Sequence, residues 1–187
     1  MSNKTKITRE ILIKTAFDIV REGGFEKLST RVLAEKVGCS TQPIFSNFDN
    51  FEKLCQIVIE LSYQKYLDTI NEVILSKKYP EYKSSGIAYV RFAKEEKNLF
   101  KLLFMRDRSK EDIVPDYSWE KSIELIKNNL SISDKKAQLF HLEMWTVVHG
   151  LAVMCATSFY NIDEELVSVI LSDTYNGLRS QVGVKND

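Results

Sequence analysis

The sequence contains few of the residues that interrupt helices or build covalent and metal sites. Its 187 residues include seven glycines, three prolines, three cysteines and two histidines. So little glycine and proline favours a mostly helical chain without low-complexity linkers. Cys39, Cys55 and Cys155 stand singly, without C-x-x-C spacing. Isolated cysteines predict reduced thiols in a cytoplasmic protein and no metal site.

The sequence also shows neither a secretion signal nor a long apolar run. Its first ten residues, MSNKTKITRE, are polar, and we find no run of about 18 apolar residues. We therefore expect a cytoplasmic protein with no membrane segment. The hydrophobic fraction of 44% is enough for a substantial core, and the charged fraction of 28% favours solubility.

Charge is balanced overall but unevenly distributed. Residues 1–48 contain eight basic and five acidic side chains, and the rest of the chain compensates to a net charge of zero. A basic excess favours contact with nucleic acid, and pairing of two chains would double it. Lys4, Lys6 and Arg9 precede or open the first predicted helix, where they either reach phosphates or form a solvated charged end.

The most informative stretch is LSTRVLAEKVGCSTQPIFSNFDNFEKL, at residues 28–54. Ser29 is a suitable N-cap for a short helix, and Gly38 is a suitable stop for it. Ser40 is expected to cap a second short helix, with Pro43 tolerated in its first turn. The small polar side chains expected on the outer face of this helix are Thr41, Gln42, Ser46 and Asn47.

Ile44 and Phe48 lie four residues apart, so they share the buried face of that second helix. A short helix with a polar outer surface, held by the helix before it, is how a helix-turn-helix presents a reading helix to the DNA major groove. A helical hairpin with a polar face but no DNA-binding role is the alternative.

These residues resemble the DNA-binding domain of the tetracycline-repressor (TetR) family of bacterial transcriptional regulators, over about the first quarter of the chain. The matching features are Gly23-Gly24-Phe25, Ser29-Thr30-Arg31 with Leu33-Ala34, Val37-Gly38-Cys39-Ser40, Ile44-Phe45, Phe48, and Glu52 with Leu54. The resemblance implies an all-α fold of about nine helices. A three-helix helix-turn-helix domain would occupy residues 1–49, and a helical bundle for ligand binding and dimerisation would occupy residues 50–187.

The resemblance also implies which residues touch DNA. Thr30 and Arg31 would contact phosphates, while glutamine and asparagine can pair with adenine edges. Phe45 stands where the family usually has a tyrosine that contacts a phosphate. Phe51 stands where a lysine is common, and Lys53 is the expected substitute. The predicted DNA-binding residues are Thr30, Arg31, Ser40, Thr41, Gln42, Pro43, Phe45, Ser46, Asn47 and Lys53.

Apolar periodicity predicts the remaining helices. They are expected at residues 8–22, 51–77, 82–95, 99–104, 117–129, 134–159 and 163–181. Either Asp49 or Asn50 is expected to cap the long helix that starts at Phe51. The charged stretch at residues 106–116, which contains Pro115, is predicted to be a surface loop.

Residues 144–156, MWTVVHGLAVMCA, are apolar on nearly every face of a helix. Such a helix is buried all round, so one face requires cover beyond the core of its own chain. Together with the last helix it predicts a four-helix interface with twofold symmetry, and a monomeric bundle is the alternative. The predicted interface residues are Val148, Leu151, Cys155, Leu166, Val167, Ile170, Leu171, Thr174 and Leu178.

Trp145, His149 and Gly150 form a W-x-x-x-H-G motif. The motif resembles a subgroup of TetR-type regulators named for those residues. With the neighbouring aromatics it predicts an apolar pocket for a small molecule, and plain core packing is the alternative. The predicted pocket residues are Tyr63, Tyr66, Phe100, Phe104, Trp119, Trp145 and His149.

The sequence thus predicts a homodimeric, ligand-responsive transcriptional regulator. It is expected to act as a repressor on a pseudo-palindromic double-stranded DNA operator, from which a small apolar or amphipathic effector releases it. The alternative is a DNA-binding coregulator or activator with a vestigial pocket controlled by a protein partner. An enzyme is not expected: Gly-rich phosphate loops and H-E-x-x-H are absent from the sequence, and Glu143 and His149 are spaced for different helix faces. We therefore predict no catalytic residue, cofactor or metal.

Overall fold

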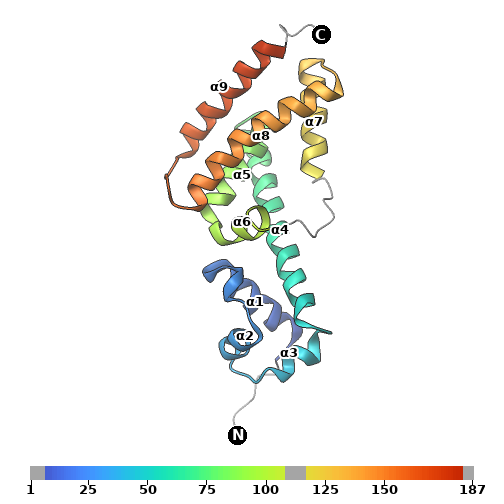
Figure 1. The fold of residues 1–187 in the computed structure, drawn as a ribbon, viewed down its shortest axis with the longest axis vertical. Helices are drawn as coiled ribbons and strands as arrows, with labels where there is room; N and C mark the ends of the chain where they lie inside the picture. Colours follow the sequence, from blue (N-terminus) through green and yellow to red (C-terminus); the bar gives the residue numbers. More distant parts are fainter. Residues whose placement is uncertain (1–6, 108–116, 183–187) are drawn as a thin grey trace. The chain divides into compact units, whose positions relative to one another are not determined.

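The structure is a computed structural model that describes residues 7–107 and 117–182. Over these residues the chain is all-α, with nine α-helices, one short 3-10 helix and no strand (Figure 1). The predicted all-α fold class is confirmed. The surface loop predicted at residues 106–116 lies mostly outside the described residues.

The chain divides into two compact units, Met1–Leu67 with Glu96–Arg106, and Asp68–Glu95 with Asp107–Asp187. The first contains α1 (Arg9–Gly23), the 3-10 helix (Phe25–Lys27), α2 (Thr30–Val37), α3 (Gln42–Asn47), most of α4 (Phe51–Leu75) and α6 (Lys97–Phe104). The second contains the end of α4, α5 (Glu81–Glu95), α7 (Tyr117–Leu130), α8 (Asp134–Ala156) and α9 (Glu164–Val182). The boundary predicted after residue 49 falls within the first unit, which continues along α4 to Leu67 and also includes α6, which contacts α1.

Local signals define the ends of α2. The Ser29 hydroxyl accepts a hydrogen bond from the Val32 N–H at 3.2 Å, as an N-cap does. Gly38 ends the helix in the left-handed region, with φ 77° and ψ 37°. The N–H of Cys39 then donates to the Ala34 carbonyl at 2.9 Å. Both predicted ends of this helix are confirmed.

The prediction that Ser40 caps α3 is wrong. The residue before α3 is Thr41, whose backbone is already helical (φ −73°, ψ −15°) and whose side chain makes no capping bond. Its carbonyl accepts from the Ile44 N–H at 3.1 Å, so the helix starts one residue later than Ser40 would require. Ile44 is fully buried and Phe48 is 5% exposed, and these two side chains anchor α3 in the first unit.

In the second unit, α8 contacts α5, α7 and α9. Figure 1 shows α8 running alongside α9 and across α5. Gly86 of α5 lies where a Cβ atom would come within 3.0 Å of Leu171 Cδ1 and 3.3 Å of Val148 Cγ2. Leu171 and Val148 are both buried. A glycine at this position therefore lets α5 approach α8 and α9 closely.

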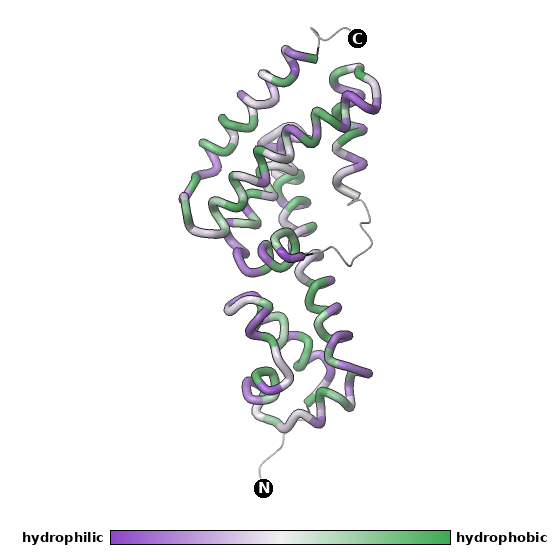
Figure 2. Tube along the Cα trace, in the orientation of Figure 1, coloured by the Kyte–Doolittle hydropathy of each residue, from purple (hydrophilic) through white to green (hydrophobic). Residues whose placement is uncertain are grey.

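Apolar residues follow α8 along most of its length (Figure 2). By length and composition this helix could cross a membrane, so the absence of a membrane segment stays a prediction. The core helix of a bundle passes the same test, and nine residues of α8 are buried against the rest of the second unit. Length and composition therefore do not distinguish a membrane-spanning helix from the core helix of a bundle.

Candidate nucleic-acid interface

The outward face of α3 carries four exposed side chains, and they follow helical spacing. They belong to Thr41, Gln42, Phe45 and Ser46. Positions three and four apart share a face, so these residues lie opposite the buried Ile44. Phe45 is 56% exposed, although it is a large aromatic side chain. Three of the four polar side chains predicted for this face are thus exposed on it, together with one apolar ring.

Two side chains of this segment bond to the helix itself. The Ser46 hydroxyl donates to the Gln42 carbonyl at 2.9 Å. The Asn47 Nδ2 donates to the Pro43 carbonyl at 2.7 Å. Asn47 and Pro43 are half-buried, so both lie at the edge of the outward face rather than at its centre. Of the two amide side chains expected to read bases, Gln42 is the more accessible.

The two residues predicted to contact phosphates stand in the first turn of α2. Arg31 is exposed and Thr30 is half-buried, and they follow directly on the Ser29 cap. Free N–H groups and the helix dipole make the start of a helix favourable for negative charge. The guanidinium of Arg31 adds a full positive charge at the same place.

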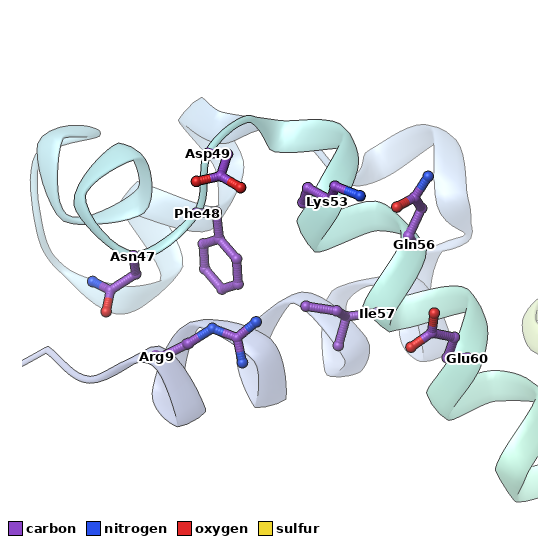
Figure 3. A pocket seen from close by; sticks show the side chains of 8 residues that line it. All are labelled: Arg9, Asn47, Phe48, Asp49, Lys53, Gln56, Ile57 and Glu60. Carbon is purple, nitrogen blue, oxygen red and sulfur yellow. The ribbon is translucent and has the colours of Figure 1, made fainter.

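A pocket of about 260 Å³ opens beside α3, between the start of α1 and the first turns of α4 (Figure 3). Its lining residues are Arg9, Asn47, Phe48, Asp49, Lys53, Gln56, Ile57 and Glu60. The Arg9 guanidinium carbon lies 4.9 Å from the centre of the Phe48 ring. This contact depends on how α1 packs against the end of α3, and no local sequence pattern specifies it.

Lys53 stands in the first turn of α4. The Asn50 Oδ1 accepts from the Lys53 N–H at 2.9 Å, so Asn50, rather than Asp49, is the capping side chain. Lys53 itself is exposed. Of the three basic residues considered at the N-terminus, Arg9 is placed at the pocket, whereas Lys4 and Lys6 lie outside the described residues.

The seven predicted pocket residues do not gather in one unit. Four of them form an aromatic row in the first unit, in the order Tyr63, Tyr66, Phe104 and Phe100, with ring centroids 5.9, 5.2 and 5.2 Å apart. Tyr66 is 4% exposed and Phe100 is fully buried. Tyr66 and Phe100 are thus core residues, whereas Tyr63 and Phe104 are half-buried.

The other three belong to the second unit. Trp145 stacks on His149 with ring centroids 4.8 Å apart, and Trp119 lies 6.2 Å from Trp145. The Tyr89 hydroxyl lies 2.9 Å from His149 Nδ1. Burial lowers the pKa of His149 below its ordinary value, which favours the neutral ring.

His141 repeats this arrangement two helical turns earlier and was not predicted. The Tyr82 hydroxyl lies 3.0 Å from His141 Nδ1, and the Trp119 ring lies 4.4 Å from the imidazole. Burial lowers the pKa of His141 to about 4. The sequence could have predicted this position, because His141 lies eight residues before His149 and positions i and i+8 share a helix face.

Five of the nine residues predicted for a dimer interface are already buried in a single chain. They are Val148, Leu151, Cys155, Val167 and Leu171. The structure therefore assigns these five to the core of the second unit. Ile170, Thr174 and Leu178 are half-buried, and Leu166 is exposed. The apolar side chains that α8 and α9 leave exposed are Leu139, Leu142, Trp145, Met154, Leu166 and Val169.

Within the described ranges, no group of three or more His, Cys, Asp or Glu side chains could hold a metal ion. No protein-family model matches the chain, and no curated protein matches it. A function is therefore inferred from the geometry of α2, α3 and the elements beside them.

Proposed function

We propose that this protein is a DNA-binding transcriptional regulator in which α2 and α3 form a helix-turn-helix. The observation that carries the proposal is the outward face of α3, where Thr41, Gln42 and Ser46 are exposed while Ile44 anchors the opposite side. A buried anchor with short hydrogen-bonding side chains outside is what a helix needs to lie in a major groove and contact base edges.

Cationic side chains on three neighbouring elements would hold the DNA backbone. Arg31 stands at the start of α2, Lys53 at the start of α4 and Arg9 at the start of α1. Phosphate contacts of this kind position the protein without reading sequence. They also make affinity fall with salt, by roughly one unit of logarithmic slope for each phosphate neutralised.

We further propose that two chains pair through the exposed apolar side chains of α8 and α9. Leu142, Leu166 and Val169 are 47%, 41% and 50% exposed, which favours cover by a second chain. Pairing would place two copies of α3 on half-sites about 34–36 Å apart, or a multiple of that distance. A variant with Leu166→Asp and Val169→Asp should sediment as a single chain, whereas Leu75→Asp, at an exposed site on α4, should not alter assembly.

The aromatic side chains of the second unit suit a small apolar or amphipathic effector that releases DNA. Trp145 is 36% exposed beside His149, so part of this cluster is accessible. A ligand that binds the folded protein raises its unfolding temperature. Thermal unfolding against a metabolite panel tests this part of the proposal. If a protein partner regulates the protein instead, no small molecule should shift the unfolding temperature.

The central experiment is selection of duplexes from a random pool by the full-length protein at a stated salt concentration. We expect one half-site sequence to be enriched. Gln42→Ala should then weaken binding to the selected duplex more than to a scrambled one, whereas Gln181→Ala, at an exposed site on α9, should change neither. Arg31→Ala should weaken both and reduce the salt dependence. Failure to enrich any sequence, or equal affinity of Gln42→Ala and wild type, would overturn the proposal.

A further inference from the structure

Phe45 is the most exposed large apolar side chain among the described residues of the first unit. It is 56% exposed, compared with 39% for Val32 and 38% for Leu61. The core beneath α3 is already filled by Ile44 and Phe48, so Phe45 adds nothing to it. Its ring carries no hydrogen-bonding group. On a DNA base edge, which carries no cation, the ring is therefore best matched by apolar atoms.

Few hydrogen-bonding side chains of α3 are left to contact a base. The helix, QPIFSN, contains no charged residue. Lysine and arginine are the usual readers of guanine in the major groove, so α3 has none. Ser46 and Asn47 each donate a proton to a carbonyl of their own helix. Within the described part of the chain, the Gln42 side-chain amide makes no hydrogen bond and presents both donor and acceptor.

The Gln42 amide and the Phe45 ring together match an A·T base pair. Adenine presents an N7 acceptor and an N6 donor, which a glutamine amide can bind together, and thymine presents the only methyl group in the major groove. Gln42 and Phe45 are three residues apart on one face, which places their Cβ atoms about 5–6 Å from each other. Successive bases are about 3.4 Å apart along a strand, so the two side chains reach the same or adjacent base pairs.

We propose that α3 reads A·T pairs, with Gln42 on an adenine edge and Phe45 on the 5-methyl group of a thymine within one or two base-pair steps. This inference rests on the proposed function and specifies the DNA sequence class that it takes. Its distinguishing feature is that the Gln42 amide and the Phe45 ring read A·T pairs together, with no cationic base contact from α3.

Single-atom changes in the selected duplex test the two contacts separately. Replacing each thymine by deoxyuridine removes only the methyl group. At one or two positions in each half-site this should weaken wild-type binding about fourfold, the change that losing one buried methyl group produces. Replacing the neighbouring adenine by 7-deazaadenine removes only the N7 acceptor and should also weaken binding.

The variants should separate these effects. Binding by Phe45→Ala should no longer weaken when deoxyuridine replaces thymine, but should still weaken with 7-deazaadenine. Binding by Gln42→Ala should respond to deoxyuridine and not to 7-deazaadenine. Leu61→Ala, at an exposed apolar site on α4, should keep both. Phe45 lies on the surface, so Phe45→Ala is expected to fold, and thermal unfolding checks this. The wild-type scan shows whether thymine methyl groups and adenine N7 atoms are contacted, and the variants show which side chain makes each contact.

Two results would overturn the inference while leaving the proposed function in place. One is a selected half-site that responds to neither deoxyuridine nor 7-deazaadenine. The other is a Phe45→Ala variant that binds every duplex more weakly by the same factor and keeps its deoxyuridine effect, because the ring would then touch sugar atoms. Failure of the wild-type protein to enrich any sequence would instead remove the proposed function itself.

Discussion

Arg21 of α1 and Glu96, at the start of α6, are joined by two hydrogen bonds within the first unit. The Arg21 Nε donates to Glu96 Oε2 at 2.7 Å, and its Nη2 donates to Oε1 of the same carboxylate. The Glu96 side chain is 7% exposed, whereas that of Arg21 is 50% exposed. The Asn98 amide adds a bond to the Arg21 carbonyl at 3.0 Å. These contacts fix the end of α1 to the first turn of α6.

Removing Arg21 should destabilise the first unit. Arg21→Ala leaves the buried Glu96 carboxylate without its partner, which we expect to cost about 1–3 kcal/mol after allowing for the solvent access of the arginine. Urea unfolding of the full chain measures the loss. The double variant Arg21→Ala, Glu96→Ala should cost less than the two single changes added together, because it leaves no unpaired charge.

An exposed ion pair in the same unit provides the control. Lys36 and Glu22 approach to 3.7 Å with side chains 57% and 70% exposed. Lys36→Ala should change the free energy of unfolding by less than about 0.5 kcal/mol. Equal losses for Arg21→Ala and Lys36→Ala would mean that the burial of Glu96 adds nothing to the pair.

Gly86 and Gly150 form a matched pair for testing the packing of the second unit. Both lie inside helices, so alanine should gain about 0.5–1 kcal/mol of helix propensity at either position. A Cβ at Gly86 meets Leu171 at 3.0 Å, whereas none of the described atoms lies within 4 Å of one at Gly150. We expect Gly150→Ala to raise the melting temperature and Gly86→Ala to be less stable than Gly150→Ala by about 1–3 kcal/mol. Equal stabilisation by both would show that Leu171 moves aside without cost.

Glu164 should make the stability of the second unit sensitive to acid. Its carboxylate accepts from Lys78 Nζ at 2.9 Å and Arg91 Nη2 at 2.6 Å. These bonds lower the pKa of Glu164 from its ordinary value of 4.5 to about 2. The folded state therefore favours the ionised form, and the resulting stability is complete above pH 4.5 and lost as the pH falls towards 2.

Glu164→Gln should consequently cost about 1–2 kcal/mol at pH 7, a figure reduced for solvent screening of this partly exposed group. The difference from wild type should shrink by roughly half at pH 3 and vanish near pH 2. Glu165→Gln, at the exposed neighbouring position, is the control and should show no such window. Denaturant unfolding across this pH range gives both curves.

His141 should become protonated only at a pH well below the one at which histidine is usually protonated. Burial lowers its pKa from 6.5 to about 4, so the folded state favours the neutral ring. Its contribution to stability is complete above pH 6.5 and lost as the pH falls to 4, by about 2–3 kcal/mol. The chain has two histidines, so a His149→Gln variant leaves one ring signal in the NMR spectrum. A titration midpoint near 6.5 for that signal would contradict the burial of His141.

Local patterns were sufficient for the ends of α2 and for the buried face of α3. Ser29 caps and Gly38 stops α2 because each acts on groups within a few residues. The same reasoning failed at Ser40, because Pro43 and the helical backbone of Thr41 decide where α3 begins. Capping preferences describe single residues, whereas the start of a six-residue helix depends on several at once.

Long-range contacts account for the other differences. Aromatic residues such as Tyr66 and Trp145 were grouped by composition, but they belong to different units and pack against different helices. Val148 of α8 and Leu171 of α9 were predicted to meet a second chain, because the apolar α8 and the last helix were expected to form a four-helix interface. The close approach that Gly86 allows to α5 covers them instead. Apolar periodicity identifies which residues are buried and leaves open what buries them.

The burial of Val167 and Leu171 within one chain bears on the order of events during biogenesis. A protomer that already covers these side chains does not need a second copy to complete its hydrophobic interior. In the dimer proposed above, two protomers would join through surfaces that are folded beforehand, so subunits would exchange without unfolding. Mixing tagged and untagged protein should then yield hybrid dimers at the rate of simple dissociation.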